Sequence, residues 1–292
     1  MKIAYLISVY KYPAQLIRLV KQLSTDSTYF FIHVDQRTSH EVYRQMVNGL
    51  NHLPKVFFLE RHKCYWGDFG HVRATIKGIK ALFNLNISIN YVILLTGQDY
   101  PIKSNSQIVD YLKKGEDKSF ISYFSLPYDL WCQGGLDRIE RWHFSLLSKR
   151  IQLPNKYLSF LPKRNFPKGF KPFGGPSYWC LSGECIEYIH DFINQNHQFI
   201  DYYEFVNIPD EGFFQTILLN SPLKTWLVND DLRFIKWPPG APNPQILGKQ
   251  DLEDMISSSK LFARKFDLTQ DLEILDLLDQ KISTFNMDSR EI

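Results

Sequence analysis

The stretch YVILLTGQDYP, residues 91–101, decides the fold of this chain. Its five apolar residues, 91–95, predict a buried strand. The polar pair Gln98 and Asp99 follows that strand directly. In a mainly parallel sheet, ligands bind at the carboxyl ends of the strands, so the stretch predicts both a core strand and part of a site.

The residues before this stretch alternate between strand and helix patterns. Short apolar runs predict strands, and helical spacing of apolar residues predicts helices; the strands are 2–9, 29–34 and 55–59, and the helices are 13–23, 39–50 and 70–84. This alternation predicts an α/β fold with a mainly parallel central sheet flanked by helices. Polar residues follow three of the strands as well (Ser8, Asp35 and 62–66). No glycine-rich phosphate loop follows any strand, which argues against a dehydrogenase or a P-loop enzyme.

Composition limits the function classes. A chain of 292 residues with 44% hydrophobic residues can bury one large core, and a net charge of +3 is too mild to indicate nucleic-acid binding. Residues 1–7 lead directly into a short apolar strand without a long apolar segment and a cleavage site, so we expect no signal peptide, and no apolar run approaches the ~20 residues of a membrane span. The four cysteines lack paired spacing, which indicates free thiols in a reducing compartment. The sequence therefore predicts a cytoplasmic protein.

The second half has looser patterns. We expect strands at 120–124, 178–182, 225–228 and 232–237, helices at 136–147, 184–194, 251–258 and 271–282, and a polar tail at 283–292. No linker divides the chain. We expect a single domain over 1–282.

The segment PDEGFFQTILLN, residues 209–220, offers a candidate catalytic acid. It resembles a helix start in which Asp210 caps the first turn and Glu211 lies within that turn. A carboxylate on a rigid element can act as a general base that removes a proton from a hydroxyl. The simpler interpretation, favoured by this segment alone, is that Glu211 only complements the helix dipole.

A basic and aromatic stretch covers residues 149–173. There is no acidic residue between Ser145 and Gly183, whereas lysine, arginine, phenylalanine and proline recur. The stretch is either a solvated surface excursion or a surface for anionic partners, such as a lipid headgroup or an acidic glycan.

Five segments, in order, resemble one family. They are LTGQDYPI (95–102), GPSYWCLS (175–182), PDEGFFQT (209–216), LRFIKW (232–237) and LFARKFD (261–267). Together they resemble the core-2/I-branching β-1,6-N-acetylglucosaminyltransferase family, which includes the peptide O-xylosyltransferases. The similarity runs from about His33 to Asp267, which is most of the chain.

The resemblance implies a GT-A-like glycosyltransferase fold, a UDP-sugar donor and inversion at the anomeric carbon. It makes Glu211 the general base, with N-acetylglucosamine as the first expectation for the sugar. Xylose, another sugar, or a non-catalytic carbohydrate-binding role remain alternatives. The family needs no divalent metal, and it places Lys265 on the diphosphate. The residues agree: where other GT-A enzymes carry D-x-D, this chain has Gln98 and Asp99, and a lone carboxylate is a poor site for a hard cation.

The resemblance also divides the domain into a donor half at roughly 1–125 and an acceptor and catalytic half at roughly 126–282. Further site residues follow from it. On the donor side, Asp35 is expected at the uridine, with a turn cap as the alternative, and Gln98, Asp99 and Arg264 near the diphosphate. The short loop between Trp237 and Asp251 has no arginine at the place of the family's second cation, so Lys249 or Arg264 is the candidate replacement. On the acceptor side, the expected residues are Arg138, Arg141, Trp179 and Trp237. The expected partners are a UDP-sugar and a glycan or lipid-linked oligosaccharide. We expect a soluble, bacterial-type member with peripheral contact at the inner face of the cell membrane through residues 149–173.

Overall fold

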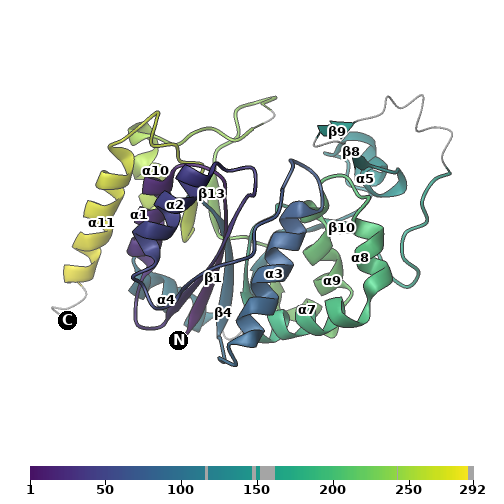
Figure 1. The fold of residues 1–292 in the computed structure, drawn as a ribbon, viewed down its shortest axis with the longest axis horizontal. Coiled ribbons are helices and arrows are strands. Elements are labelled where there is room, and N and C mark those ends of the chain that lie inside the picture. Colours follow the sequence, from purple (N-terminus) through teal and green to yellow (C-terminus); the bar gives the residue numbers. More distant parts are fainter. Residues whose placement is uncertain (116–117, 147–148, 152–161, 242, 289–292) are drawn as a thin grey trace.

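A seven-stranded mixed sheet forms the centre of the molecule (Figure 1). The computed structural model describes residues 1–292 apart from 116–117, 147–148, 152–161, 242 and 289–292. The strand order is β3-β2-β1-β4-β11-β6-β12, with bounds β1 Ile3–Val9, β2 Thr28–Val34, β3 Val56–Phe58, β4 Tyr91–Thr96, β6 Ser119–Ile121, β11 Trp179–Ser182 and β12 Leu227–Val228. The first four strands are mutually parallel, and β11 runs antiparallel between β4 and β6. The α/β fold with a mainly parallel central sheet that the sequence predicts is confirmed.

Helices cover both faces of this sheet (Figure 1). In β1 the alternating side chains Tyr5 and Leu6 enter two different apolar clusters, because successive strand residues point to opposite faces. One cluster contains side chains of α1 Pro13–Leu23, α2 His40–Leu50, α4 Asn105–Lys114, α10 Leu252–Ser257 and α11 Ile274–Asp288. The other contains side chains of α3 Gly70–Asn84, α7 Gly183–Gln195, α8 His197–Tyr203 and α9 Phe213–Leu219.

Smaller elements complete the described part of the chain. A three-stranded sheet joins β13 Arg233–Ile235, β14 Phe262–Arg264 and β5 Asp99–Pro101, and two-stranded sheets join β7 Phe124–Ser125 with β10 Phe173–Gly174 and β8 Phe144–Leu146 with β9 Lys149–Ile151. Short helical elements are η1 Cys132–Gly135, α5 Leu136–Glu140, η2 Pro209–Glu211, η3 Pro222–Trp226 and η4 Lys249–Asp251. Pairing of β14 with β5 brings the C-terminal residues 262–264 beside the end of β4.

Three sequence expectations differ from the structure. The helix expected over 136–147 ends at Glu140, because Trp142 and Phe144 alternate like strand residues and both pack on Phe205. The strand expected over 225–228 is limited to β12, since η3 occupies the residues up to Trp226. The helix expected to stop at residue 282 continues to Asp288, so the first part of the expected tail is helical.

Within the described residues, no helix has both the length and the apolar character needed to cross a bilayer. All four cysteines are free thiols, and Cys64, Cys180 and Cys185 are buried.

Candidate active site

Five chain segments meet at the carboxyl edge of the parallel strands. They follow β1, β2, β3, β4 and β14, and backbone hydrogen bonds join them directly. Asp35 N donates to Val9 O at 2.9 Å, and Gly97 N donates to Ser8 O at 3.0 Å. Phe266 N donates to Gln98 O at 2.9 Å, which fixes the segment after β14 to the segment after β4. The polar residues that the sequence placed at strand ends are therefore neighbours.

Lys265 is a partly exposed cation at this edge. Among the described residues its ammonium makes no hydrogen bond or ion pair, and the side chain is only half-buried. Burial, Arg264 and Lys11 together lower the pKa of Lys265. Because neighbouring positive charges oppose its protonation, the surroundings of Lys265 favour an anion.

Asp99 and Arg264 lie beneath this surface. Asp99 has no exposed side-chain area, and its Oδ2 accepts hydrogen bonds from Thr96 N at 2.6 Å and Thr96 Oγ1 at 2.5 Å. The Nε atoms of Arg233 and Arg264 lie 3.9 and 4.0 Å from Asp99 Oδ1. Burial lowers the pKa of Arg264. The expectation that Asp99 contacts the donor is wrong, because the buried carboxylate instead balances two guanidinium groups.

Gln98 joins neighbouring segments. Its Nε2 donates to Phe266 O at 3.2 Å, beside Lys265, and the side chain remains partly exposed. Gln15, a fully buried residue of α1, donates to both Gly97 O and Phe266 O at 2.8 and 3.2 Å. These amide contacts fix the backbone on either side of Lys265.

Glu211 lies in the short turn η2 and not in the helix that follows it. The helix α9 begins at Phe213, and Gly212, with φ −157°, separates it from the turn. The expected capping role of Asp210 is wrong: Asp210 Oδ2 accepts a hydrogen bond from Ser177 Oγ at 2.7 Å, and neither η2 nor α9 has a side-chain cap. The turn is held in place by Ile208 N donating to Gly67 O and Gly175 N donating to Glu211 O.

The Glu211 carboxylate has one oxygen bound and one open. Arg138 Nη1 donates to Oε2 at 2.6 Å, whereas no described residue contacts Oε1. A third of the side chain (32%) reaches solvent, although protein atoms surround it closely. This burial raises the pKa of Glu211 above the usual range of a glutamate, and Asp210 adds to the rise, whereas Arg138 opposes it. A carboxylate with a raised pKa and an open oxygen is suited to accept a proton.

Arg138 is held from behind by an aromatic ring. Its guanidinium carbon lies 3.6 Å from the centroid of the Trp131 ring, a cation–π contact that leaves one edge of the guanidinium for Glu211. Trp131 in turn packs edge-on against Phe124, with ring centroids 4.8 Å apart. Arg138 therefore has a defined position next to the candidate base.

Ser177 and Tyr178 connect the acidic and basic sides of the site. Ser177 donates to Asp210, the neighbour of Glu211, and the Tyr178 ring lies 4.2 Å from the guanidinium carbon of Arg264, the neighbour of Lys265. Glycine is required at position 175, because a Cβ there would approach Ser122 O to 2.1 Å. The segment 175–178 thus fixes Glu211 and Lys265 relative to one another.

Asp35, expected at the uridine, is bound by Arg37. The carboxylate accepts Arg37 N at 2.8 Å, Arg37 Nε at 3.1 and 3.2 Å and Arg37 Nη2 at 2.6 Å. Burial alone would raise the pKa of Asp35, but the side-chain and backbone hydrogen bonds from Arg37 outweigh it and lower the pKa. The turn-cap alternative for Asp35 is supported by the bond from Arg37 N, and its uridine contact stays a prediction.

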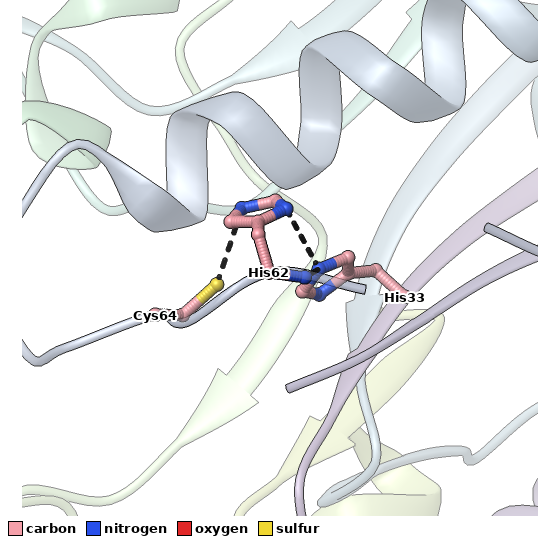
Figure 2. Close-up of side chains that lie close together, drawn as sticks. All are labelled: His33, His62 and Cys64. Atoms are coloured by element: carbon pink, nitrogen blue, oxygen red, sulfur yellow. Dashed lines mark hydrogen bonds between the residues drawn. The ribbon is translucent and has the colours of Figure 1, made fainter. Parts of the chain in front are cut away.

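His33, His62 and Cys64 form the one cluster of the described residues with metal-ligand composition (Figure 2). Gly70 O can only accept, so His62 donates to it through Nε2 at 2.8 Å. His33 Nε2 accepts the backbone amide of His62 at 3.2 Å and lies 3.0 Å from His62 Nδ1. Cys64 Sγ lies 3.5 Å from His62 Nε2. Figure 2 shows the two partners at different nitrogens of the His62 ring. The ligand atoms of the three residues lie within 4.8 Å of one another, and in this structure their contacts join the end of β2 to the start of α3.

Burial keeps the side chains of this His33, His62 and Cys64 cluster uncharged. Burial, and secondarily His62, lowers the pKa of His33 to about 3, and burial raises the pKa of Cys64 to about 12. A neutral imidazole and a protonated thiol suit a structural role beside Asp35.

The expected acceptor residues divide into two groups. The expectation that Trp179 contacts the acceptor is wrong, because this side chain has no exposed area and packs in the core against Phe214, with ring centroids 5.6 Å apart. Trp237, at 58% exposure, and the partly exposed Arg138 and Arg141 can reach a ligand. In the basic stretch 149–173, residues 152–161 lie outside the described part of the chain.

Several site residues were missed by the sequence analysis. Lys11, Arg37, Trp131, Ser177 and Tyr178 contribute contacts described above. Lys11 had an available signal, because it follows the first predicted strand at the ligand-binding edge. Arg37 lies two residues after Asp35, and Ser177 and Tyr178 lie within the family-like segment 175–182, so these three also had a local signal. Trp131 was indicated by no such pattern.

Comparison with known proteins gives one consistent family. The family model described as Core-2/I-Branching enzyme matches residues 3–256. Xylosyltransferase 2 of Mus musculus is 28% identical over 302 residues, covering 95% of this chain and 33% of that protein. Xylosyltransferase 1 of Rattus norvegicus is 24% identical over 301 residues, covering 95% of this chain and 35% of that protein. The chain thus spans about a third of the length of the curated relatives it matches.

A solved structure of 4-diphosphocytidyl-2C-methyl-D-erythritol synthase from Anaerococcus prevotii is 9% identical. The matched region covers 68% of this chain and 82% of the chain in that structure, with a TM-score of 0.34. A similarity of this size carries no inference.

Proposed function

This chain belongs to the Core-2/I-Branching enzyme family, and from that membership we propose that it is an inverting glycosyltransferase. It moves a sugar from a UDP-sugar to a hydroxyl group of a glycan acceptor and forms a β-linkage. The observation that carries the proposal is the Glu211 carboxylate, whose Oε2 is fixed by Arg138 while Oε1 stays open and the pKa is raised.

In the proposed reaction, the acceptor hydroxyl attacks the anomeric carbon of the donor. Its proton passes to Glu211, and the bond between the anomeric carbon and the β-phosphate oxygen breaks with its electron pair on the departing UDP. Base catalysis of this kind contributes about 10²- to 10⁴-fold to the rate. Arg138 holds the carboxylate in position so that the open oxygen faces the acceptor.

Positive side chains stabilise the leaving diphosphate in this proposal. Lys265 supplies an ammonium with no protein partner among the described residues. The acid in the D-x-D position, Asp99, is buried between Arg233 and Arg264 and is closed to a divalent cation. We therefore expect full activity in excess EDTA. Loss of activity in EDTA with recovery in Mn²⁺ would contradict this expectation.

The donor sugar needs direct measurement. N-acetylglucosamine was the first expectation from the sequence, and the names of the matched relatives favour xylose. A panel of UDP-sugars, screened by thermal shift and by release of UDP, tests the proposal. We expect UDP and one sugar donor to raise the melting temperature and that donor to release UDP. No response to UDP or to any UDP-sugar at millimolar concentration would refute it.

A carbohydrate-binding protein without turnover is the second candidate function. The open Glu211 oxygen argues against it, since binding alone requires no group poised to accept a proton. Glycan binding without UDP release from any donor would favour this candidate.

The acceptor is proposed to be a glycan or a lipid-linked oligosaccharide. The described part of the stretch 149–173 contains exposed Lys163, Lys168 and Lys171, which suit an anionic surface. Sedimentation with phosphatidylglycerol liposomes at low and high salt tests peripheral binding at the inner face of a membrane. Absence of binding at low salt would remove membrane contact from the proposal and leave the transferase unaffected.

A further inference from the structure

A UDP leaving group needs more positive charge than Lys265 alone supplies. A departing diphosphate carries at least two negative charges, and fixed cations at the site of developing charge are an effective source of catalysis. The loop 238–248 contains no lysine or arginine. A second cation must therefore come from elsewhere at the carboxyl edge of the sheet.

The two candidates considered from the sequence are already committed. Lys249 Nζ pairs with Glu273 Oε2 at 2.7 Å on the protein surface. The Arg264 side chain is 11% exposed, and its guanidinium lies on the Tyr178 ring above Asp99. Arg264 thus affects the site through its field and not by reaching a ligand.

Lys11 has the required position. It follows β1, whose parallel neighbours β2 and β4 carry Asp35 and the Gly97–Gln98 segment at the same edge. Its side chain is 31% exposed, so a ligand can reach the ammonium. A hydrogen bond of 2.8 Å from Lys11 Nζ to Tyr12 Oη fixes its direction.

Asp267 ties Lys11 to the Lys265 segment. Tyr12 Oη donates to Asp267 Oδ2 at 2.8 Å, and Lys11 Nζ lies 3.5 Å from the same oxygen. The other oxygen of Asp267, Oδ1, accepts hydrogen bonds from Thr269 N and Thr269 Oγ1, so both carboxylate oxygens of Asp267 are held in place. The two lysines are therefore held together by an acid only two residues from Lys265.

Positive charge exceeds negative charge in this cluster. Lys11 and Lys265 share one acid, Asp267, and Arg264 and Arg233 share another, Asp99, so each pair of cations carries one positive charge in excess. The influence of Lys11 on Lys265 is repulsive and contributes to the lowered pKa of Lys265. An anion bound between the two ammonium groups relieves this repulsion.

We propose that Lys11 is the second diphosphate-binding cation and acts beside Lys265 on the phosphates of the departing UDP. This assignment rests on the proposed transferase function. Asp267 and Tyr12 keep Lys11 directed towards the site before the donor binds, which reduces the entropy lost on binding.

Calorimetric titration with uridine, UMP and UDP tests the proposal without any requirement for an acceptor. We expect Lys11→Met and Lys265→Met each to weaken UDP binding about 10- to 100-fold, as expected for one charge-assisted contact, and to leave uridine binding unchanged. Lys11→Arg should retain part of the affinity. Lys21→Met removes an exposed lysine near the far end of α1 and should change nothing.

The outcomes separate the two proposals. If wild-type protein binds no UDP, the transferase proposal and this assignment both fail. If Lys265→Met weakens UDP binding and Lys11→Met does not, only the assignment of Lys11 fails. A Lys11→Met variant that weakens uridine and UDP equally, or loses thermal stability alone, would show that Lys11 only braces Asp267 and would also overturn the assignment.

Discussion

Asp35 and Glu211 are two candidate site carboxylates, each paired with an arginine, and their pKa values move in opposite directions. Asp35 receives hydrogen bonds from the backbone amide of Arg37 and from Nε and Nη2 of its guanidinium, and these bonds lower the pKa of Asp35 against the effect of burial. Glu211 receives one bond from Arg138, and burial raises its pKa despite that bond. The number of donors to the ionised form, more than the presence of an arginine, decides whether such a group stays a stable anion or becomes a base.

The largest expected effect concerns Glu211 itself. Glu211→Gln keeps the shape and the contact to Arg138 but removes the proton acceptor, so turnover should fall at least about 100-fold. UDP affinity and melting temperature should stay near those of the wild type, because the raised pKa means that the ionised form is not favoured by folding. Glu204→Gln, in an exposed pair with Arg73, is the control. Near-normal turnover of Glu211→Gln would remove Glu211 from the proposed role.

Substitution of Asp35 should instead lower the stability of the fold. Asp35→Asn removes a buried acceptor of four hydrogen-bond contacts, so the free energy of unfolding at pH 7 should fall by about 2 kcal/mol. The folded-state pKa is lowered, so this stabilisation is complete above the unfolded pKa of about 4 and is lost as the pH falls through the folded value. Urea unfolding at pH 7 and below pH 4 measures the difference. An equal loss at both pH values would contradict the ion pair.

Arg138 should set the acid limb of the activity profile. Arg138→Met removes the positive charge that opposes the raised pKa of Glu211, so the pKa should rise further. The acid limb of kcat/KM should therefore move to higher pH, and catalysis at pH 6 should suffer more than at pH 8. Arg73→Met serves as the matched control. A uniform loss at every pH would assign Arg138 to acceptor binding alone.

The smallest effect provides the baseline for these comparisons. Arg73 and Glu204 form an ion pair at 2.7 Å with side chains 47% and 40% exposed. Solvent screens such pairs, so Arg73→Met should change the free energy of unfolding by no more than about 0.5 kcal/mol. Chemical denaturation at low and high salt measures it. A loss as large as that of Asp35→Asn would undermine the distinction between buried and exposed pairs.

The fold was predictable where local pattern and burial agree. Apolar runs in β1, β2 and β4 and the helical spacing in α1 and α3 gave elements within a few residues of the observed bounds. Failures occurred where tertiary contacts decide. Packing of Trp142 and Phe144 on Phe205 ended the expected helix at Glu140, and burial inside the sheet removed Trp179 from the acceptor surface.

The site was predictable only as a set of residues. The sequence indicated Glu211 as a general base and Lys265 as a diphosphate-binding cation, and both roles stay predictions. It could not indicate that Arg138 binds Glu211 across 73 positions or that Ser177 and Tyr178 link the two sides, because these contacts depend on chain crossings without local sequence signals. The expected division into a donor half and an acceptor half also remains a prediction, and Lys265, expected at the donor, comes from the second half.

Strand β14 has a consequence for how the protein is made. It pairs with β5, setting Ala263 beside Tyr100, so the Lys265 segment joins strands formed from the first hundred residues. Contacts this distant in sequence form late in folding, and N-terminal parts of a chain emerge first from the ribosome. The carboxyl edge of the parallel strands can therefore assemble before the Lys265 segment joins it, and the proposed contact of Lys265 with a diphosphate forms only when synthesis is almost complete. We therefore expect a chain truncated before residue 262 to lack that proposed contact.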